Sequence, residues 1–337
     1  MAEHTSGSTS DFPKVQLHIV TGKGGTGKST VAASLALALA SRGKTVLLCE
    51  VEGRQGIAQL FDVSPLPYEE RLLAKASEAG HGDVYAIAID AESALLEYLA
   101  MYYRLGRAGK ALDRFGVIDF ATTIAPGVRD VLLTGKVYEA AQRNSRNKGA
   151  RTYDAIVLDA PPTGRITQFL NVNNELAGLA KVGPIKAQAD TVTTLLRSSR
   201  TAVHLVTVLE EMPVQETADG VAELQAAGLP VGGVIVNMVR PQDLDAEARE
   251  QLLAGTLDQK ALAAAVGSVG LKAPATLVKQ LVAEGRDHAE RRMLEDSQRE
   301  IVDGIGVPVY ELPLLAGGAD LSGLYELASS LRDQRLA

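Results

Sequence analysis

Short apolar runs alternate with longer stretches of helical periodicity along most of the chain. The gaps between successive runs are long enough for helices, and strands that alternate with helices form mostly parallel sheets covered on both faces. We therefore predict an α/β fold in which a mostly parallel sheet is flanked by helices. The runs that predict strands are residues 15–20, 45–51, 84–89, 153–158, 203–208, 232–236 and 307–311.

Two stretches interrupt this alternation. Residues 91–150 and 171–200 are helical by pattern, and we expect them to pack together as one inserted helical subdomain. An Ala-rich and charged stretch, about residues 243–300, also predicts helices, without the period of a repeat array. Residues 1–13 are polar and rich in Ser and Thr, so we expect a disordered tail followed by one folded domain over residues 14–337.

The charge balance and composition argue against several classes of partner. The chain has 34 Lys and Arg against 41 Asp and Glu, a formal net charge of −7, and only 4% aromatic residues, so neither a basic face nor a stacking platform for nucleic acid is expected. No secretory signal is visible, and the apolar run at residues 31–40 is too short to span a bilayer. We expect a cytoplasmic protein with no stable membrane insertion.

The histidines and the single cysteine do not form a transition-metal motif. The five histidines are scattered over separate elements, without the spacing of metal ligands. Cys49 ends an apolar predicted strand and is most simply a small core residue in a reducing compartment. We expect no transition-metal site in one chain.

A glycine-rich segment carries the strongest chemical signal. It matches G-x-x-x-x-G-K-[ST] from Gly22 to Ser29, follows an apolar strand and precedes an Ala/Leu-rich helix. Glycine allows backbone N–H groups to approach phosphate oxygens closely, and the helix start adds its positive dipole end. We predict a phosphate-binding loop formed by Gly24, Gly25, Thr26, Gly27, Lys28, Ser29 and Thr30.

Three side chains of this loop have predicted roles in binding ATP and Mg²⁺. Lys28 is expected to reach the β- and γ-phosphates, and the Ser29 hydroxyl to hold Mg²⁺. Lys23 can lie beside the phosphates of a nucleotide held by a facing subunit, where it would stabilise the transition state much as an arginine finger does. The alternative for Lys23 is a solvated loop lysine.

A second motif follows the predicted strand at residues 153–158. Asp159 stands at the carboxyl end of this strand, where an acid can hold a water of Mg²⁺. The Pro-Pro-Thr-Gly segment that contains Pro162 can bring a backbone amide near the γ-phosphate and would order with ATP and relax with ADP. Asp159 is therefore the candidate switch acid, and Pro162 a candidate nucleotide contact.

Together these motifs resemble those of the family of arsenite-pump ATPases and tail-anchored-protein targeting ATPases, within the deviant-Walker class of P-loop ATPases. The family's loop, K-G-G-x-G-K-[ST], matches residues 23–29, and its second switch, D-T-A-P-T-G-H-T-x-R-F-L, matches residues 159–170 with substitutions. Further similar segments follow in order, so the resemblance covers nearly the whole chain from Val15. It implies a P-loop NTPase fold and ATP hydrolysis with Mg²⁺.

The resemblance also implies an adenine site. Asn237 ends a strand that resembles the family's V-V-N strand, whose Asn contacts adenine. Pro313 and Leu314 lie in a segment similar to the family's last strand and adenine-side loop. For these two residues, a plain connection between strand and helix is the competing interpretation.

The first and second switches depart from the family pattern. Where the family has D-P-A-H-S-L, this chain has Glu52 at the first position, so the carboxylate that is expected to orient the attacking water is one methylene longer. An ordinary surface glutamate is the alternative. Arg165 replaces a histidine of the second switch, and sensing of the γ-phosphate, contact with a partner subunit and a solvated position all remain open for it.

In the targeting ATPases that this chain resembles, paired helical subdomains form a hydrophobic groove for a client's membrane helix. An apolar stripe in the predicted subdomain could line such a groove, although a stripe of this kind is more often core. The stripe consists of Leu95, Leu96, Leu99, Met101, Tyr102 and Tyr103.

A three-thiolate arsenite site or a shared Cys-x-x-Cys zinc clamp cannot be built from one cysteine.

We therefore predict Mg²⁺-dependent ATP hydrolysis that opens and closes a dimer to handle a client or partner protein. The dimer is either a homodimer or a heterodimer with a paralogue. The alternative, from the altered first switch, is a weakly hydrolysing, ATP-gated adaptor or scaffold, either alone or paired with a paralogue. Catalytic roles in this prediction belong to Lys23, Glu52 and Asp159.

Overall fold

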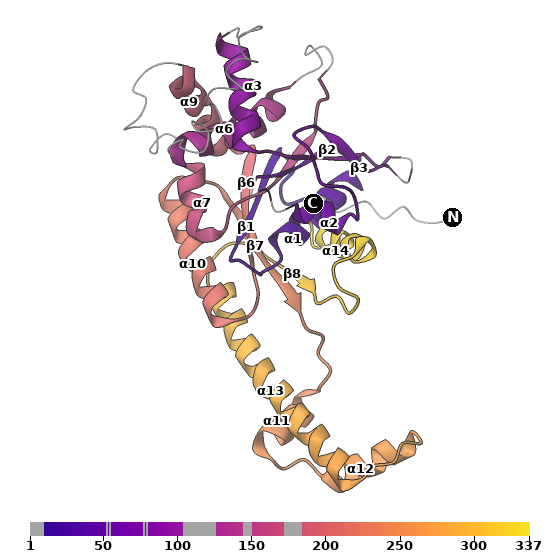
Figure 1. Cartoon of the computed structure of the whole chain (residues 1–337). Coiled ribbons are helices and arrows are strands. Elements are labelled where there is room, and N and C mark those ends of the chain that lie inside the picture. Colours follow the sequence, from indigo (N-terminus) through magenta and orange to yellow (C-terminus); the bar gives the residue numbers. More distant parts are fainter. Residues whose placement is uncertain are drawn as a thin grey trace, which may run out of the picture.

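An eight-stranded sheet forms the centre of the molecule, as seen in the computed structural model of the chain (Figure 1), which describes residues 10–51, 53, 55–76, 78, 80–103, 126–143, 150–171 and 184–337. The strand order is β3-β4-β2-β5-β1-β6-β7-β8, and all neighbours are parallel except β3 and β4. The prediction of a mostly parallel sheet is thus confirmed. The strands are β1 (Leu17–Gly22), β2 (Val46–Glu50), β3 (Arg71–Ala74), β4 (Val84–Ala88), β5 (Ala155–Asp159), β6 (Thr201–Thr207), β7 (Val231–Val239) and β8 (Val309–Pro313).

Strand β3 was missed in the sequence. It pairs antiparallel with β4 at the edge of the sheet, and its residues are exposed or half-buried. An edge strand of this kind has no neighbour along its outer side, so it lacks the continuous apolar run that marks the central parallel strands.

Helices cover both faces of the sheet. One face packs against α1 (Lys28–Ala40), α2 (Gly56–Leu60) and α14 (Leu321–Asp333). The other packs against α6 (Pro126–Gln142), α7 (Thr163–Leu170), α9 (Pro184–Leu196) and α10 (Glu211–Ala226). Helix α1 is buried on nearly every side because it lies between the sheet and α14, which explains its unbroken Ala and Leu sequence.

The helices α3 (Ala91–Tyr103), α6 and α9 gather beyond one end of the sheet (Figure 1). Leu95 on α3 is buried against Leu132 of α6, so this member of the apolar stripe belongs to a small core, and Leu96 packs against the same cluster. The side chains of Leu99, Met101, Tyr102 and Tyr103 lie outside the described part of the chain. Residues 104–125, 144–149 and 172–183, which belong to the predicted subdomain, are likewise not described.

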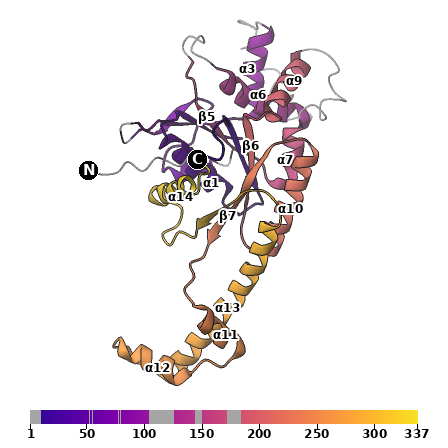
Figure 2. The ribbon, with the colours of Figure 1, turned by 180° about the vertical axis from the view of Figure 1, so that it is seen from behind.

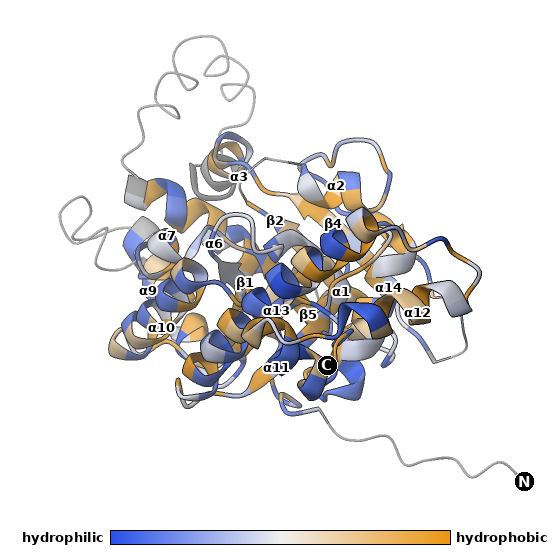
Figure 3. Ribbon diagram, turned by 90° about the horizontal axis from the view of Figure 1, so that it is seen from below, coloured by the Kyte–Doolittle hydropathy of each residue, from blue (hydrophilic) through white to orange (hydrophobic). Residues whose placement is uncertain are grey.

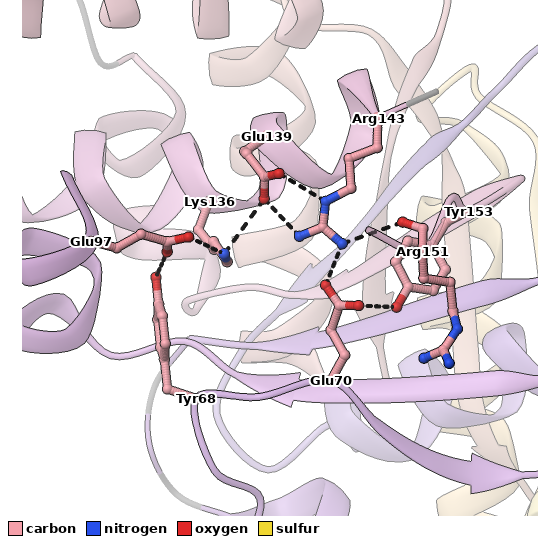
Figure 4. Close-up of polar contacts among 8 residues, drawn as sticks. All are labelled: Tyr68, Glu70, Glu97, Lys136, Glu139, Arg143, Arg151 and Tyr153. Atoms are coloured by element: carbon pink, nitrogen blue, oxygen red, sulfur yellow. Dashed lines mark hydrogen bonds and ion pairs between the residues drawn. The ribbon is translucent and has the colours of Figure 1, made fainter. Parts of the chain in front are cut away.

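A polar network joins these helices to the sheet (Figure 4). Arg143, directly after α6, contacts Glu70 at 2.5 Å and Glu139 at 2.7 Å, and Glu70 also accepts a hydrogen bond from the Tyr153 hydroxyl at 2.5 Å. Burial is the largest single influence on the pKa of Glu139 and raises it, but the hydrogen bonds and positive charges of Arg143 and Lys136 together outweigh burial and lower the pKa. Because the Arg143 side chain is only 8% exposed, these charges depend on one another for neutralisation.

A helical arm extends from the opposite side of the sheet body (Figures 1 and 2). It consists of α11 (Ala246–Ala254), α12 (Gln259–Ser268) and the 29-residue α13 (Ala275–Asp303), as the helical pattern of residues 243–300 predicts. At 1.5 Å per residue, α13 is about 44 Å long. Its base is attached by Val302, which enters the sheet core, and by Glu295, which contacts Arg240 at 2.5 Å and Arg292 at 2.9 Å.

The two termini of the described chain meet beside the sheet. The Asp11 amide donates to the Arg335 carbonyl at 2.8 Å, and the Phe12 ring lies edge-on to His204, so residues 10–13 contact the domain. His204 on β6 stacks on His18 of β1, with 3.1 Å between the ring nitrogens. Burial lowers the pKa of His204 to about 4 and that of His18 well below its usual value, so both rings are neutral at pH 7.

Helix α13 is long, but Figure 3 shows that it is largely hydrophilic, so it does not have the character of a membrane helix. Among the residues that the structure describes, no helix combines the length and the apolar character needed to cross a bilayer.

Candidate nucleotide-binding site

The glycine-rich loop connects the end of β1 to the start of α1. A Cβ atom on Gly22 would lie 2.2 Å from the Val206 carbonyl oxygen of β6, so a side chain has no room there. Gly27 has a φ of +87°, and a Cβ atom on it would lie 2.4 Å from the Asn237 amide nitrogen. Both positions require glycine, because a side chain has no room at either and both have a positive φ, +152° at Gly22 and +87° at Gly27.

Hydrogen bonds hold the loop in a compact turn. The Thr26 hydroxyl donates to the Lys23 carbonyl at 2.9 Å, and the Asn237 side chain donates to the Thr26 carbonyl at 2.9 Å. Asn237 lies on β7, two strands away from β1. The loop and the predicted adenine-contacting residue are therefore brought together, although they are 211 residues apart in sequence.

Lys28 begins α1 under this loop. Its side chain is almost completely buried, with 8% of the residue exposed, and it makes no hydrogen bond or ion pair with the described part of the chain. The ammonium itself is not among the fully buried atoms without a partner, so it reaches the surface of the loop. The position is suited to a polyphosphate, whose oxygens would supply the missing charge.

Ser29 and Asp159 meet at the other side of the loop. The Ser29 hydroxyl donates to Asp159 Oδ2 at 2.5 Å, and Asp159, at the end of β5, is 7% exposed. Hydroxyl and carboxylate oxygens are the ligands that Mg²⁺ prefers, and Mg²⁺ commonly takes one or two carboxylates together with phosphates and water. The donor set therefore fits this ion.

Glu50 is a third oxygen-bearing residue at this edge, and the sequence interpretation missed it. It ends β2 and is in register with Asp159 of the neighbouring β5. Glu50 is 2% exposed, and its Oε1 accepts a hydrogen bond from the Gly56 amide at 3.1 Å. The signal was available, because an acid at the end of a buried apolar strand is the same pattern that singled out Asp159.

Lys23 contacts its own chain. Its ammonium lies 2.6 Å from Glu216 Oε2 of α10, and the two side chains are 33% and 29% exposed. The pair holds Lys23 beside the loop. A role for Lys23 toward a facing subunit remains a prediction that would require this ion pair to open.

The first switch is only partly described. Glu52 and Arg54 lie outside the described residues, so the prediction for Glu52 stays open. Gln55, just after them, has a φ of +56° and is held by two hydrogen bonds between its side-chain amide and the backbone of Leu66, at 2.7 and 3.1 Å. Gln55 is thus anchored to the segment that precedes β3.

The second switch leads directly into α7. Pro162 is the N-cap residue of this helix and carries no N–H group, so the amides that the segment can present belong to Thr163 and the residues after it. Thr163 is 2% exposed, and its hydroxyl has no hydrogen-bond partner among the described residues. Arg165 is 56% exposed and approaches Asp130 of α6 at 4.0 Å, which directs it toward the helices beyond the sheet.

A cavity of about 370 Å³ lies at the carboxyl ends of β7 and β8. Pro313 and Leu314, both predicted purine contacts, line it together with Val239 and Arg240. The Leu314 amide donates to the Val239 carbonyl at 2.8 Å, which holds the two walls together. Asn237 lies on β7, two residues before Val239 of the cavity wall. Pro313 ends the neighbouring strand β8, and Leu314 follows it directly.

Comparison with known proteins agrees with this geometry. The sequence profile of the family described as anion-transporting ATPase matches residues 15–195. The protein "ATPase BagA" of Mycobacterium tuberculosis is 50% identical over 98% of this chain and 97% of its own length. A "Putative arsenical pump-driving ATPase 2" of Aquifex aeolicus is 26% identical over 68% of this chain and 83% of its own. "ATPase get3" of Neurospora crassa is 27% identical over 55% of this chain and 51% of its own.

Proposed function

The chain belongs to the anion-transporting ATPase family and is an ATPase, and on this premise we propose that Mg²⁺-dependent ATP hydrolysis opens and closes a dimer of the protein to handle a client or partner protein. The observation that carries the nucleotide part of the proposal is the contact between Ser29 and Asp159 at 2.5 Å, beside the buried Lys28. A hydroxyl, a carboxylate and an ammonium at a glycine loop are the groups needed to bind a metal–nucleotide complex.

Each protein group has a proposed part in the reaction. The amides of residues 24–30 and the Lys28 ammonium bind and orient the phosphates, and Ser29 and Asp159 would hold Mg²⁺. When bound, Mg²⁺ neutralises charge on the phosphate oxygens. Glu52 is proposed to orient the attacking water. The base is proposed to contact Asn237, Pro313 and Leu314.

Lys23 is proposed to act on the nucleotide of a facing subunit. Support comes from its place on the loop, where its ion pair with Glu216 is about one-third exposed and of the kind that contributes little stability. Breaking this pair on dimer closure would therefore cost little. Hydrolysis would then require two chains, either identical or paralogous.

Helix α7 supports the link between nucleotide state and the outer helices. It begins at the second switch and packs against α6, which in turn packs against α3 and α9. A change in the switch would thus be passed to α6 through direct contact. We propose that this movement releases or captures a protein client.

The proposal does not extend to arsenical transport, which the names of some relatives mention. The chain has one cysteine, Cys49, and it is completely buried. Burial raises the pKa of its thiol well above the usual value, so a thiolate ligand is disfavoured.

A second candidate is a weakly hydrolysing adaptor that is gated by ATP binding. Two observations favour it: Glu52 stands where the resembling family has an aspartate, and Lys23 is paired within its own chain. A longer carboxylate would misplace the attacking water, and a shift near 1 Å can cost about a hundredfold in rate.

The two candidates are separated by phosphate release from ATP and Mg²⁺ over a wide range of protein concentration. For the dimeric ATPase, specific activity should rise with concentration and collapse in Lys23→Ala and Lys28→Ala. Arg286→Ala, on the exposed arm, serves as the control and should behave as wild type. A low rate that does not depend on concentration, despite ATP binding, would contradict the self-sufficient enzyme and support the adaptor or a missing paralogue.

A further inference from the structure

Glu50 and Asp159 form a pair of carboxylates on adjacent strands. The two residues are in register between β2 and β5, so their side chains leave the sheet on the same face. The residues two and four positions before Glu50 are Leu48 and Val46, and both lie in the core beneath α1. Because side chains alternate along a strand, Glu50 faces the side of the sheet on which α1 begins with Lys28 and Ser29.

The contacts of Gly56 place Glu50 near the proposed metal ligands. Glu50 Oε1 accepts a hydrogen bond from the Gly56 amide, and a Cβ atom on Gly56 would lie 3.5 Å from the Ser29 hydroxyl. Ser29 in turn contacts Asp159 at 2.5 Å. The three oxygen-bearing side chains thus belong to neighbouring positions at the carboxyl edge of the sheet, with Gly56 between Glu50 and Ser29.

One carboxylate oxygen of Glu50 accepts no hydrogen bond from the described residues. This oxygen, Oε2, is buried, and Glu50 as a whole is only 2% exposed. A buried carboxylate oxygen without a partner is costly, and a bound ion or its water is one of the features that explain such an atom.

We propose that Glu50 is a second carboxylate of the Mg²⁺ site, which helps to retain the hydrated ion through its unpartnered oxygen. This inference rests on the proposed function, because it assigns a further residue to the same metal–nucleotide site. Mg²⁺ loses its water reluctantly, so carboxylates near its ligands contribute by accepting hydrogen bonds from bound water. The hydrogen bond to Gly56 would keep the Glu50 carboxylate in position.

A purely structural Glu50 would act differently. Its one described hydrogen bond holds the start of α2, and a glutamine could accept the same bond from the Gly56 amide. The metal role needs the negative charge, whereas the structural role needs only an acceptor. Glu50→Gln and Glu50→Ala therefore separate the two roles.

The test is the binding of ADP to the full chain, measured by titration calorimetry in EDTA and at increasing Mg²⁺. In wild type, Mg²⁺ should tighten ADP binding. In Glu50→Gln, the Mg²⁺ concentration for half of this effect should rise about tenfold or more. ADP affinity in EDTA should remain equal or increase, because a negative charge near the phosphates is removed. Glu326→Gln, an exposed residue of α14, is the matched control.

Each other outcome overturns the inference in a distinct way. A wild-type Mg²⁺ requirement in Glu50→Gln, with weakened binding in Glu50→Ala, would show that Glu50 only holds α2. Loss of ADP binding by Glu50→Gln in EDTA would likewise assign it a structural role. If ADP binding by the wild type did not respond to Mg²⁺, the metal part of the proposed function would fail as well.

Discussion

At the scale of single residues, the observed partner of Lys23 excludes the partner that is proposed for it. It contacts Glu216 of its own chain at 2.6 Å, whereas the proposed reaction needs it at the nucleotide of a facing subunit. Both side chains of the pair are about one-third exposed, so the pair is screened by solvent and contributes between about 0 and 1 kcal/mol. The pair is thus a weak restraint on Lys23 that closure of a dimer can overcome.

Removing this restraint should favour the active dimer. In Glu216→Gln, we expect the protein concentration for half-maximal ATPase activity to fall by up to about fivefold, which corresponds to a contribution near 1 kcal/mol. The measurement is phosphate release across a dilution series. Asp219→Asn, on the same helix but paired with Gln215, is the control. A higher concentration requirement in Glu216→Gln would mean that Glu216 helps to form the dimer.

At the scale of elements, Arg143 links the outer helices to the edge of the sheet. It follows α6 and neutralises Glu139 of that helix and Glu70 of the segment before β3 (Figure 4). Lys136, about two turns earlier, contacts Glu97 of α3 at 2.7 Å. The network therefore joins α3 and α6 to the sheet edge through partly buried charges as well as through apolar packing.

We expect Arg143→Met to lower the free energy of unfolding by about 3–5 kcal/mol, because two carboxylates, of which Glu70 is largely buried, lose their neutralising partner. Urea unfolding followed by circular dichroism measures the change. The matched control is Arg286→Met on α13, whose exposed pair with Glu290 should contribute about 0.5 kcal/mol or less. Equal effects of the two substitutions would contradict the structural role of the network.

At the scale of the whole molecule, the arm of α11–α13 makes the protein elongated (Figures 1 and 2). The arm is attached at its base, where Glu295 joins Arg292 to Arg240, and Arg240 also lines the cavity beside Pro313. Farther from the sheet, α13 packs against α11 and α12. The cavity that is proposed to hold the adenine therefore shares Arg240 with the attachment point of the arm.

The extended arm should be visible in solution. A compact chain of this length has a radius of gyration of about 20 Å. We expect small-angle X-ray scattering of the nucleotide-free monomer to give a clearly larger value, with light scattering to establish that the sample is monomeric. A radius near 20 Å would mean that the arm folds back on the domain.

The sequence by itself determined the features whose physics is local. The glycine loop, the strand before it and the helix after it are contiguous, and the residue types alone specify a phosphate site. The central strands were also predictable, because strands buried on both faces are continuous apolar runs. The family resemblance added Asn237, Pro313 and Leu314, which the structure brings to the same side of the sheet's carboxyl edge.

Only the tertiary structure decided the contacts between distant segments. The register of β2 against β5 places Glu50 beside Asp159, and packing of α10 against the sheet brings Glu216 to Lys23. Edge strand β3 and the direction of the arm likewise depend on neighbours that lie far away in sequence. A local pattern records which residues can be buried or charged, but the partner of a buried charge is set by chain topology, which no single segment encodes.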